Sequence, residues 1–167
     1  MIGKARTVAG VLALVWMCVI FAFSAQEKEE SSAVSEAFSY RMVNSTGILF
    51  HLHLDEEELR QIAAAIEGGV RKAAHMTEFG ILSVLVYVWL GKWALATGRK
   101  ITIAALVATV YAASDEFHQL WVPGRAGTIG DVMIDGIGAV LGACIFVGVR
   151  KCIIFLWNRH RSKDIKS

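Results

Sequence analysis

Proline, charge and cysteine are all scarce in this sequence. It has one proline and three cysteines among 167 residues, and only 19% of its residues are charged. So low a charged fraction, with 55% hydrophobic residues, excludes a disordered chain and a nucleic-acid partner and argues against an ordinary soluble globule. Fifteen glycines beside one proline fit closely packed helices, because glycine lets helix backbones approach in lipid. We therefore expect an all-α integral membrane protein.

Four apolar segments are each close to the roughly 20 residues that a helix needs to cross the hydrocarbon. They lie at about 8–25, 73–90, 101–122 and 131–149. The first also suits a signal peptide, since Ala22-Phe23-Ser24 resembles a small-x-small cleavage site, but the three later segments favour a retained helix. The three cysteines fall within or just inside these segments, so we interpret them as packing residues.

The expected architecture is therefore a four-helix bundle in the membrane, formed by a single domain over 1–167. Residues 26–70 form an extracytoplasmic loop containing an amphipathic helix, and residues 150–167 form a cytoplasmic tail.

The distribution of lysine and arginine predicts the orientation of this multi-pass protein. One side carries a single acid, Asp164, and eleven cations: Lys4, Arg6, Lys92, Arg99, Lys100, Arg150, Lys151, Arg159, Arg161, Lys163 and Lys166. The other side carries six cations and fourteen acids. Because cytoplasmic flanks accumulate lysine and arginine, we expect both termini in the cytoplasm.

The long loop has two distinct halves. Phe38–Leu54 is partly apolar but interrupted by polar residues, which indicates an interfacial helix or a partly buried loop. Asp55 is suited to cap a helix with an acidic first turn, and this helix is expected to end near Gly68-Gly69. Its apolar stripe would lie against the outer membrane surface or cover the other helices as a lid; the alternative is a solvated acidic connector.

Polar side chains gather at the predicted outer ends of the spans. Arg71, His75 and Glu78 follow one another at i, i+4 and i+7, so they share one face of the second span. In the third span, Asp115 shares a face with His118 and Gln119.

The fourth span starts after a tight turn over 123–127. Thr128 and Asp131 have the spacing of a capping box, and Asp131 and Asp135 lie one turn apart on one face. Gly138 and Gly142 continue that face and would allow close packing against a neighbouring helix.

Three helices thus bring ionisable groups to one level of the membrane, where such groups normally face the bundle interior and have a function. The alternative for each acid taken singly is a helix cap or an interfacial ion pair with Arg71, Lys72 or Arg125. His118 would then be an interfacial residue facing water.

The same motifs resemble the VanZ-like family of bacterial membrane proteins. They are Phe23-Ser24-Ala25-Gln26, Arg71-Lys72-Ala73-Ala74-His75-Met76-Thr77-Glu78-Phe79, Asp115-Glu116-Phe117-His118-Gln119, Pro123-Gly124-Arg125 and Asp131-Val132-Met133-Ile134-Asp135-Gly136-Ile137-Gly138, in order over roughly 20–145. The resemblance implies a location in the bacterial cytoplasmic membrane, as part of the cell envelope. It also implies a role in susceptibility to teicoplanin, a glycopeptide that acts on cell-wall precursors outside the membrane. It implies no reaction, and it does not cover the acidic insert before Arg71.

Two functions fit these residues. In the first, a pocket binds the anionic headgroup of a membrane lipid or lipid-linked cell-wall precursor, or a glycopeptide. Its ligand-binding residues would be Arg71, Lys72, His118, Gln119, Arg125, Asp131 and Asp135.

In the second, the protein is an intramembrane hydrolase or transferase acting on a phosphorylated lipid headgroup. His75 would be the base or nucleophile, and Glu78 or a neighbouring Asp would fix its tautomer. Asp115, Glu116 or Asp131 would serve as the acid or as a ligand to a divalent ion. The sequence lacks an HExxH-type spacing and the acids also have nearby cations, so we assign no specific metal site and no cofactor. The binding function is slightly favoured.

Overall fold

The computed structural model of the chain describes residues 2–164, with side chains for residues 3–161. Within that range helices are the only regular secondary structure, which confirms the expected all-α class. The helices are α1 (Ile2–Ser24), α2 (Lys28–Leu49), α3 (Glu56–Trp89), the short 3-10 helix η1 (Leu90–Lys92), α4 (Thr97–Gln119) and α5 (Ile129–Asp164). Lys166, one of the cations of the expected tail, lies outside the described residues, as does the side chain of Lys163.

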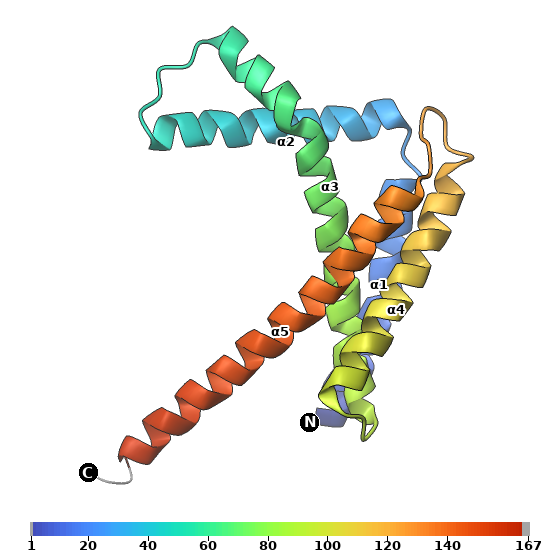
Figure 1. Cartoon of the computed structure of the whole chain (residues 1–167), viewed down its shortest axis with the longest axis vertical. Coiled ribbons are helices and arrows are strands. Elements are labelled where there is room, and N and C mark those ends of the chain that lie inside the picture. Colours follow the sequence, from blue (N-terminus) through green and yellow to red (C-terminus); the bar gives the residue numbers. More distant parts are fainter. Residues whose placement is uncertain (1, 165–167) are drawn as a thin grey trace.

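The long helices alternate in direction. α1 and α4 run one way, α3 and α5 run back, and the two ends of the chain lie toward the same end of the bundle (Figure 1). α2 lies across the opposite end, and we call these the terminal end and the α2 end. α3 is central to the fold because it contacts α1, α2, α4 and α5.

Three helices of the described chain are long and apolar enough to cross a membrane, so the chain is a membrane protein. They cover Gly3–Ser24, Glu56–Lys92 and Ile129–Arg161 and include the first, second and fourth expected spans. α4, the expected third span, is not among them because charges at both of its ends lower its hydropathy. It still packs inside the bundle, where Ala104, Ala108 and Ala112 are fully buried.

The expected helix end at Gly68-Gly69 is wrong. α3 runs unbroken from Glu56 to Trp89, so the loop helix and the second span are one helix. Its start is as expected, because Asp55 Oδ1 accepts the Glu58 N–H at 2.8 Å. Glu58 Oε2 also accepts the Asp55 N–H at 3.0 Å, which completes a capping box. A glycine ends a helix by adopting positive φ, and among the described glycines only Gly124 does so.

α2 and the first half of α3 form a helical hairpin with a small core of its own. Val43 of α2 is buried there against Leu59 and Ala63 of α3. α2 therefore confirms a helix in the 38–54 region, although the helix begins earlier, at Lys28. This packing on α2 holds the first half of α3 in line with the rest of the helix.

Glycine allows α5 to cross α3 at close range, as expected. A Cβ atom on Gly138 would lie 2.4 Å from the Met76 carbonyl oxygen, and one on Gly142 would lie 2.6 Å from the Gly80 Cα. Beyond this crossing α5 continues as one helix through most of the expected tail. The three cysteines are exposed on the helix surfaces, so the interpretation as packing residues is wrong.

Candidate functional site

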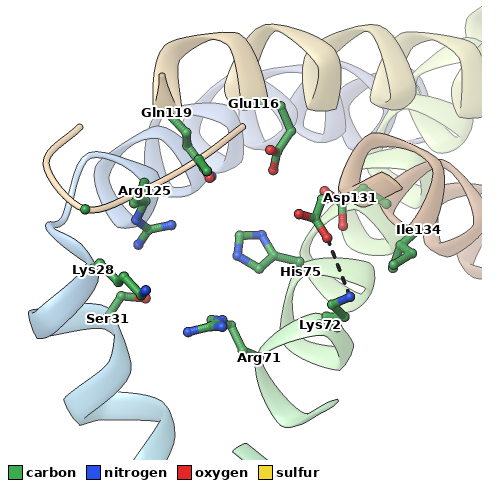
Figure 2. A pocket seen from close by; sticks show the side chains of 13 residues that line it. Lys28, Ser31, Arg71, Lys72, His75, Glu116, Gln119, Arg125, Asp131 and Ile134 are labelled. Carbon is green, nitrogen blue, oxygen red and sulfur yellow. Dashed lines mark ion pairs between the residues drawn. The ribbon is translucent and has the colours of Figure 1, made fainter. Parts of the chain in front are cut away.

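A cavity of about 200 Å³ lies at the α2 end, where α2, α3, α4, the α4–α5 loop and the start of α5 meet. We call it the charged pocket (Figure 2). Eight of the eleven expected site residues line it: Arg71, Lys72, His75, Glu116, Gln119, Arg125, Asp131 and Asp135. The α3–α5 crossing fixes two of them, because His75 precedes Met76 and Asp135 is one turn before Gly138.

The charges of the pocket are separated in space. Figure 2 shows the His75 imidazole pointing into the pocket, with Lys28, Arg71 and Arg125 on one side and acids on the other. The acids on the wall are Glu116, Asp131 and Asp135. The pocket therefore has a positive half and a negative half, with a titratable ring between them.

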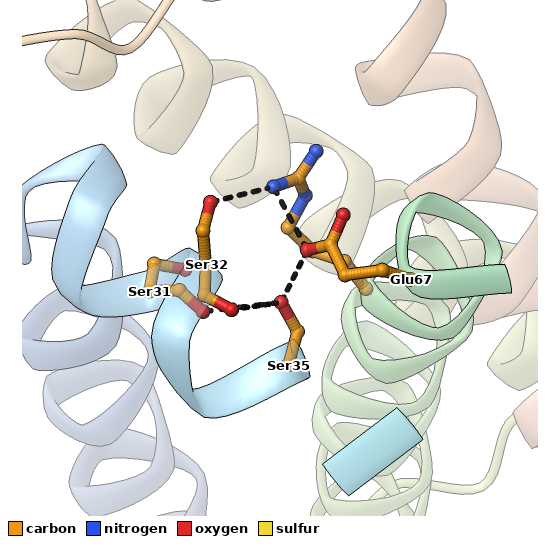
Figure 3. A network of polar contacts seen from close by, with 5 residues as sticks. Ser31, Ser32, Ser35 and Glu67 are labelled. Atoms are coloured by element: carbon orange, nitrogen blue, oxygen red, sulfur yellow. Dashed lines mark hydrogen bonds and ion pairs between the residues drawn. The ribbon is translucent and has the colours of Figure 1, made fainter. Parts of the chain in front are cut away.

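The cations of the positive half differ in whether another side chain already pairs with their charge. Arg71 Nη1 lies 3.3 Å from Glu67 Oε1 and 3.4 Å from Ser32 Oγ. Ser35 also donates to Glu67, so this network ties α2 to α3 beside the pocket (Figure 3). Lys28 forms no ion pair with any described residue, which leaves its charge available to an anion.

Lys72 lies at the border with the negative half. Its Nζ is 3.9 Å from Asp131 Oδ1, and the lysine side chain is 59% exposed. An exposed pair at that distance contributes little to stability, so a ligand can displace it at small cost.

Arg125 joins the α4–α5 loop to the end of α1. Its Nε donates to the Gln26 carbonyl at 2.9 Å and its Nη2 donates to the Phe23 carbonyl at 3.4 Å. Burial lowers the pKa of Arg125, but an arginine stays protonated in proteins. Nη1 is left for a ligand, so Arg125 has both a structural role and a place on the pocket wall.

Glu116 holds the start of α5. The Asp131 N–H donates to Thr128 Oγ1 at 3.1 Å, which is the first half of the expected capping box. In the second half of a capping box, the Thr128 N–H would donate to Asp131. Here it donates to Glu116 Oε2 at 2.9 Å, so a residue of α4 supplies this bond. Asp131 accepts from the Thr128 hydroxyl at 2.8 Å.

Glu78 does not line the charged pocket. It lies behind His75, and its Oε2 is 3.7 Å from His75 Nδ1. That distance is too long for a hydrogen bond, so the bond expected to fix the tautomer of His75 is not formed. His75 Nδ1 is buried without a hydrogen-bond partner among the described residues.

Asp115 and His118 face α1 rather than the charged pocket. Asp115 is 3% exposed and accepts from Gln119 Nε2 at 3.3 Å. Gln119 also donates to Ser24 Oγ at 3.1 Å, so this buried network joins α4 to the end of α1. The centre of the His118 ring lies 4.6 Å from that of the Phe21 ring in α1. Of Asp115, His118 and Gln119, only Gln119 lines the pocket.

Sequence reasoning missed Lys28 and Ser31, which α2 contributes to the pocket wall. The available signal was distance along the chain, because Lys28 comes four residues after the last residue of α1 and must stay near the same end of the bundle.

A profile of the VanZ/LLP1 family matches residues 9–155, which is most of the chain. The chain belongs to the VanZ/LLP1 family. The resemblance based on the motifs is thereby confirmed, and three apolar helices make this VanZ/LLP1 protein a membrane protein. Comparisons with curated proteins and with solved structures gave no match. Among the residues that the structure describes, no group of three or more His, Cys, Asp and Glu side chains could hold a metal ion.

Proposed function

We propose that this VanZ/LLP1 protein binds a phosphate-bearing headgroup in its charged pocket, outside the bacterial cytoplasmic membrane. The headgroup would belong to a membrane lipid or a lipid-linked cell-wall precursor. Both termini lie in the cytoplasm in this proposal, because the terminal end collects lysine and arginine while the α2 end collects the acids.

The observation that carries the proposal is the convergence of cations on one cavity. Lys28 of α2, Arg71 of α3 and Arg125 of the α4–α5 loop come from three separate elements and line the same space. Arginine and lysine together bind phosphate through charge-assisted hydrogen bonds. The acids opposite would accept hydrogen bonds from hydroxyl or amino groups of the same headgroup.

Binding of a cell-wall precursor would change which molecules glycopeptides meet at the cell surface. We therefore propose that the protein lowers susceptibility to teicoplanin, and that this effect depends on the positive half of the pocket. The family membership supports this part of the proposal.

The test compares cells that produce the protein or its variants at equal membrane levels. We expect the natural protein to raise the inhibitory concentration of teicoplanin, and Lys28→Gln combined with Arg71→Gln to remove that increase. Arg41→Gln combined with Arg60→Gln is the matched control, because it removes two cations from the same hairpin and neither residue lines the pocket. Equal resistance from the pocket variant and the control would contradict the proposal.

A catalytic function of the same pocket is the second candidate. It is favoured by the place of His75, whose imidazole points into the cavity with an unpartnered Nδ1 and with Glu78 close behind. In this alternative His75 acts as base or nucleophile on the phosphorylated headgroup. His75→Ala and Glu78→Gln would then abolish resistance in a protein that still binds dihexanoyl phosphatidic acid, whereas a binder would keep most of its effect.

A further inference from the structure

A second cavity, of about 330 Å³, lies at the terminal end of the bundle, opposite the charged pocket. We call it the basic pocket. Three cations from three helices line it: Arg6 of α1, Lys100 of α4 and Arg150 of α5. None of them belongs to the site described above.

The residues described around the cavity supply no countercharge for these cations. No acid lines the basic pocket, and Arg6, Lys100 and Arg150 form no ion pair within the described part of the chain. The acid of this end, Asp164, follows Arg150 by fourteen residues of the same helix, which is about 21 Å along its axis. Three like charges around one cavity repel each other, so an anion placed among them would be stabilised.

The remaining wall of the cavity is apolar and aromatic. Tyr87 is 5% exposed, and its ring meets the Phe146 ring edge-on at a centroid distance of 5.8 Å. Val88 completes this wall. Arg6 lies against η1 at Gly91, where an added Cβ would be 3.1 Å from Arg6 Nε.

We expect the cavity to lie at the boundary between headgroups and hydrocarbon. Trp89 and Trp93, which pack edge to face at 4.9 Å, lie beside it in sequence, and tryptophan is enriched at this boundary. Cations at that level beside an apolar wall fit an anion that also carries an apolar chain. A free anion would contact the cations but would have no use for the apolar wall.

We propose that the basic pocket binds an anionic phospholipid, with its phosphate among Arg6, Lys100 and Arg150 and one acyl chain along Phe146 and Val88. Basic pockets between membrane helices are suited to such headgroups, and each cation near an anionic surface contributes about fivefold in affinity. This inference does not rest on the function proposed for the charged pocket.

The test uses the full chain in phosphatidylcholine vesicles that contain spin-labelled phosphatidylglycerol or spin-labelled phosphatidylcholine. The immobilised fraction of each label, measured by electron paramagnetic resonance, gives the preference for the anionic lipid. We expect each of Arg6→Gln, Lys100→Gln and Arg150→Gln to lower that preference by up to about fivefold. The triple variant should approach the value for phosphatidylcholine.

The matched control is the triple variant Lys4→Gln, Lys92→Gln and Lys151→Gln, which removes the same charge from the same end but from residues that do not line the cavity. It should keep most of the preference for the anionic lipid. Arg6→Lys with Arg150→Lys should keep it too, which would show that the loss in the glutamine variants reflects charge and not misfolding. An equal loss in the control would overturn the proposal in favour of general surface attraction. If millimolar inorganic phosphate removes the natural protein's preference for phosphatidylglycerol, the cavity binds a free anion and the proposal is overturned.

Discussion

Two charged residues of the pocket also hold the backbone that surrounds it. Arg125 binds the Phe23 carbonyl at the end of α1 and the Gln26 carbonyl just after it. Glu116 accepts the Thr128 N–H at the start of α5. A substitution at either position therefore changes the shape of the pocket as well as its charge. Lys28 has no such bond from its side chain, which makes it the cleaner position for testing binding.

Gly127 allows the α4–α5 loop to lie directly on Glu116. A Cβ at Gly127 would be 2.1 Å from the Glu116 carbonyl oxygen, which is backbone and cannot move aside cheaply. We expect Gly127→Ala to lower the stability of the protein by about 1–3 kcal/mol, the usual cost of overpacking. The change in stability would be measured as a lower midpoint of thermal unfolding, monitored by circular dichroism.

Gly130→Ala in the same region is the control, since its Cβ would meet only the Thr128 hydroxyl at 3.6 Å. A midpoint for Gly127→Ala equal to that of Gly130→Ala would show that the loop does not pack on Glu116.

Local patterns predicted single residues well where the partners are close in sequence. The Asp55 cap on the Glu58 N–H lies within four residues and formed as expected. The Thr128–Asp131 box formed only by half, because Glu116 of α4 took the other bond. Lys28 was missed for the same reason: its place on the wall depends on how α1 turns into α2.

At the scale of elements, the length of α3 distinguishes the structure from the sequence-based expectation. A glycine pair is a local signal for a helix end, but packing of α2 on the first half of α3 and of α5 on the second half outweighs it. A Cβ atom added at Gly68 or Gly69 would meet no atom within 4 Å, so close approach requires a glycine at neither position.

We therefore expect Gly68→Ala with Gly69→Ala to stabilise the protein, by up to about 1 kcal/mol for each substitution, because alanine favours the helical state. The midpoint of thermal unfolding should rise while teicoplanin resistance stays unchanged. A lower midpoint would instead indicate that α3 ends at this pair.

The α3–α5 crossing is the contact that sets the width of the charged pocket. Gly138→Ala would place a methyl group 2.4 Å from the Met76 carbonyl oxygen and force the two helices apart. We expect a lower midpoint of thermal unfolding and weaker binding of dihexanoyl phosphatidic acid, measured by calorimetry.

The control for this crossing is Gly148→Ala, which lies on the same helix with no atom within 4 Å of the added carbon. Stability and binding should remain as in the natural protein. Unchanged values for Gly138→Ala as well would contradict the close crossing.

At the scale of the whole molecule, the alternating helices place the start of α1 and the end of α5 toward the same end of the bundle and gather opposite charges at opposite ends (Figure 1). Hydropathy alone identified three of the four expected spans. α4, the remaining span, has charges at both ends, and it owes its place to burial among its neighbours rather than to its own apolarity. Composition could therefore predict the bundle, while the division of the long loop into α2 and part of α3 required tertiary contacts.

The central claim is that the charged pocket faces the outside of the cell and binds a phosphate-bearing headgroup. The most direct measurement is labelling of Ser31→Cys, on the pocket wall, by a membrane-impermeant maleimide on intact cells. The three native cysteines, all exposed, are first replaced by alanine. Ser45→Cys, on the exposed surface of the same helix, is the control.

We expect both introduced thiols to react without permeabilisation, and dihexanoyl phosphatidic acid to slow the reaction at position 31 severalfold while leaving position 45 unaffected. Dihexanoyl phosphatidylcholine should protect neither position. Reaction at position 31 only after permeabilisation, or equal rates with and without the phosphatidic acid, would contradict the account.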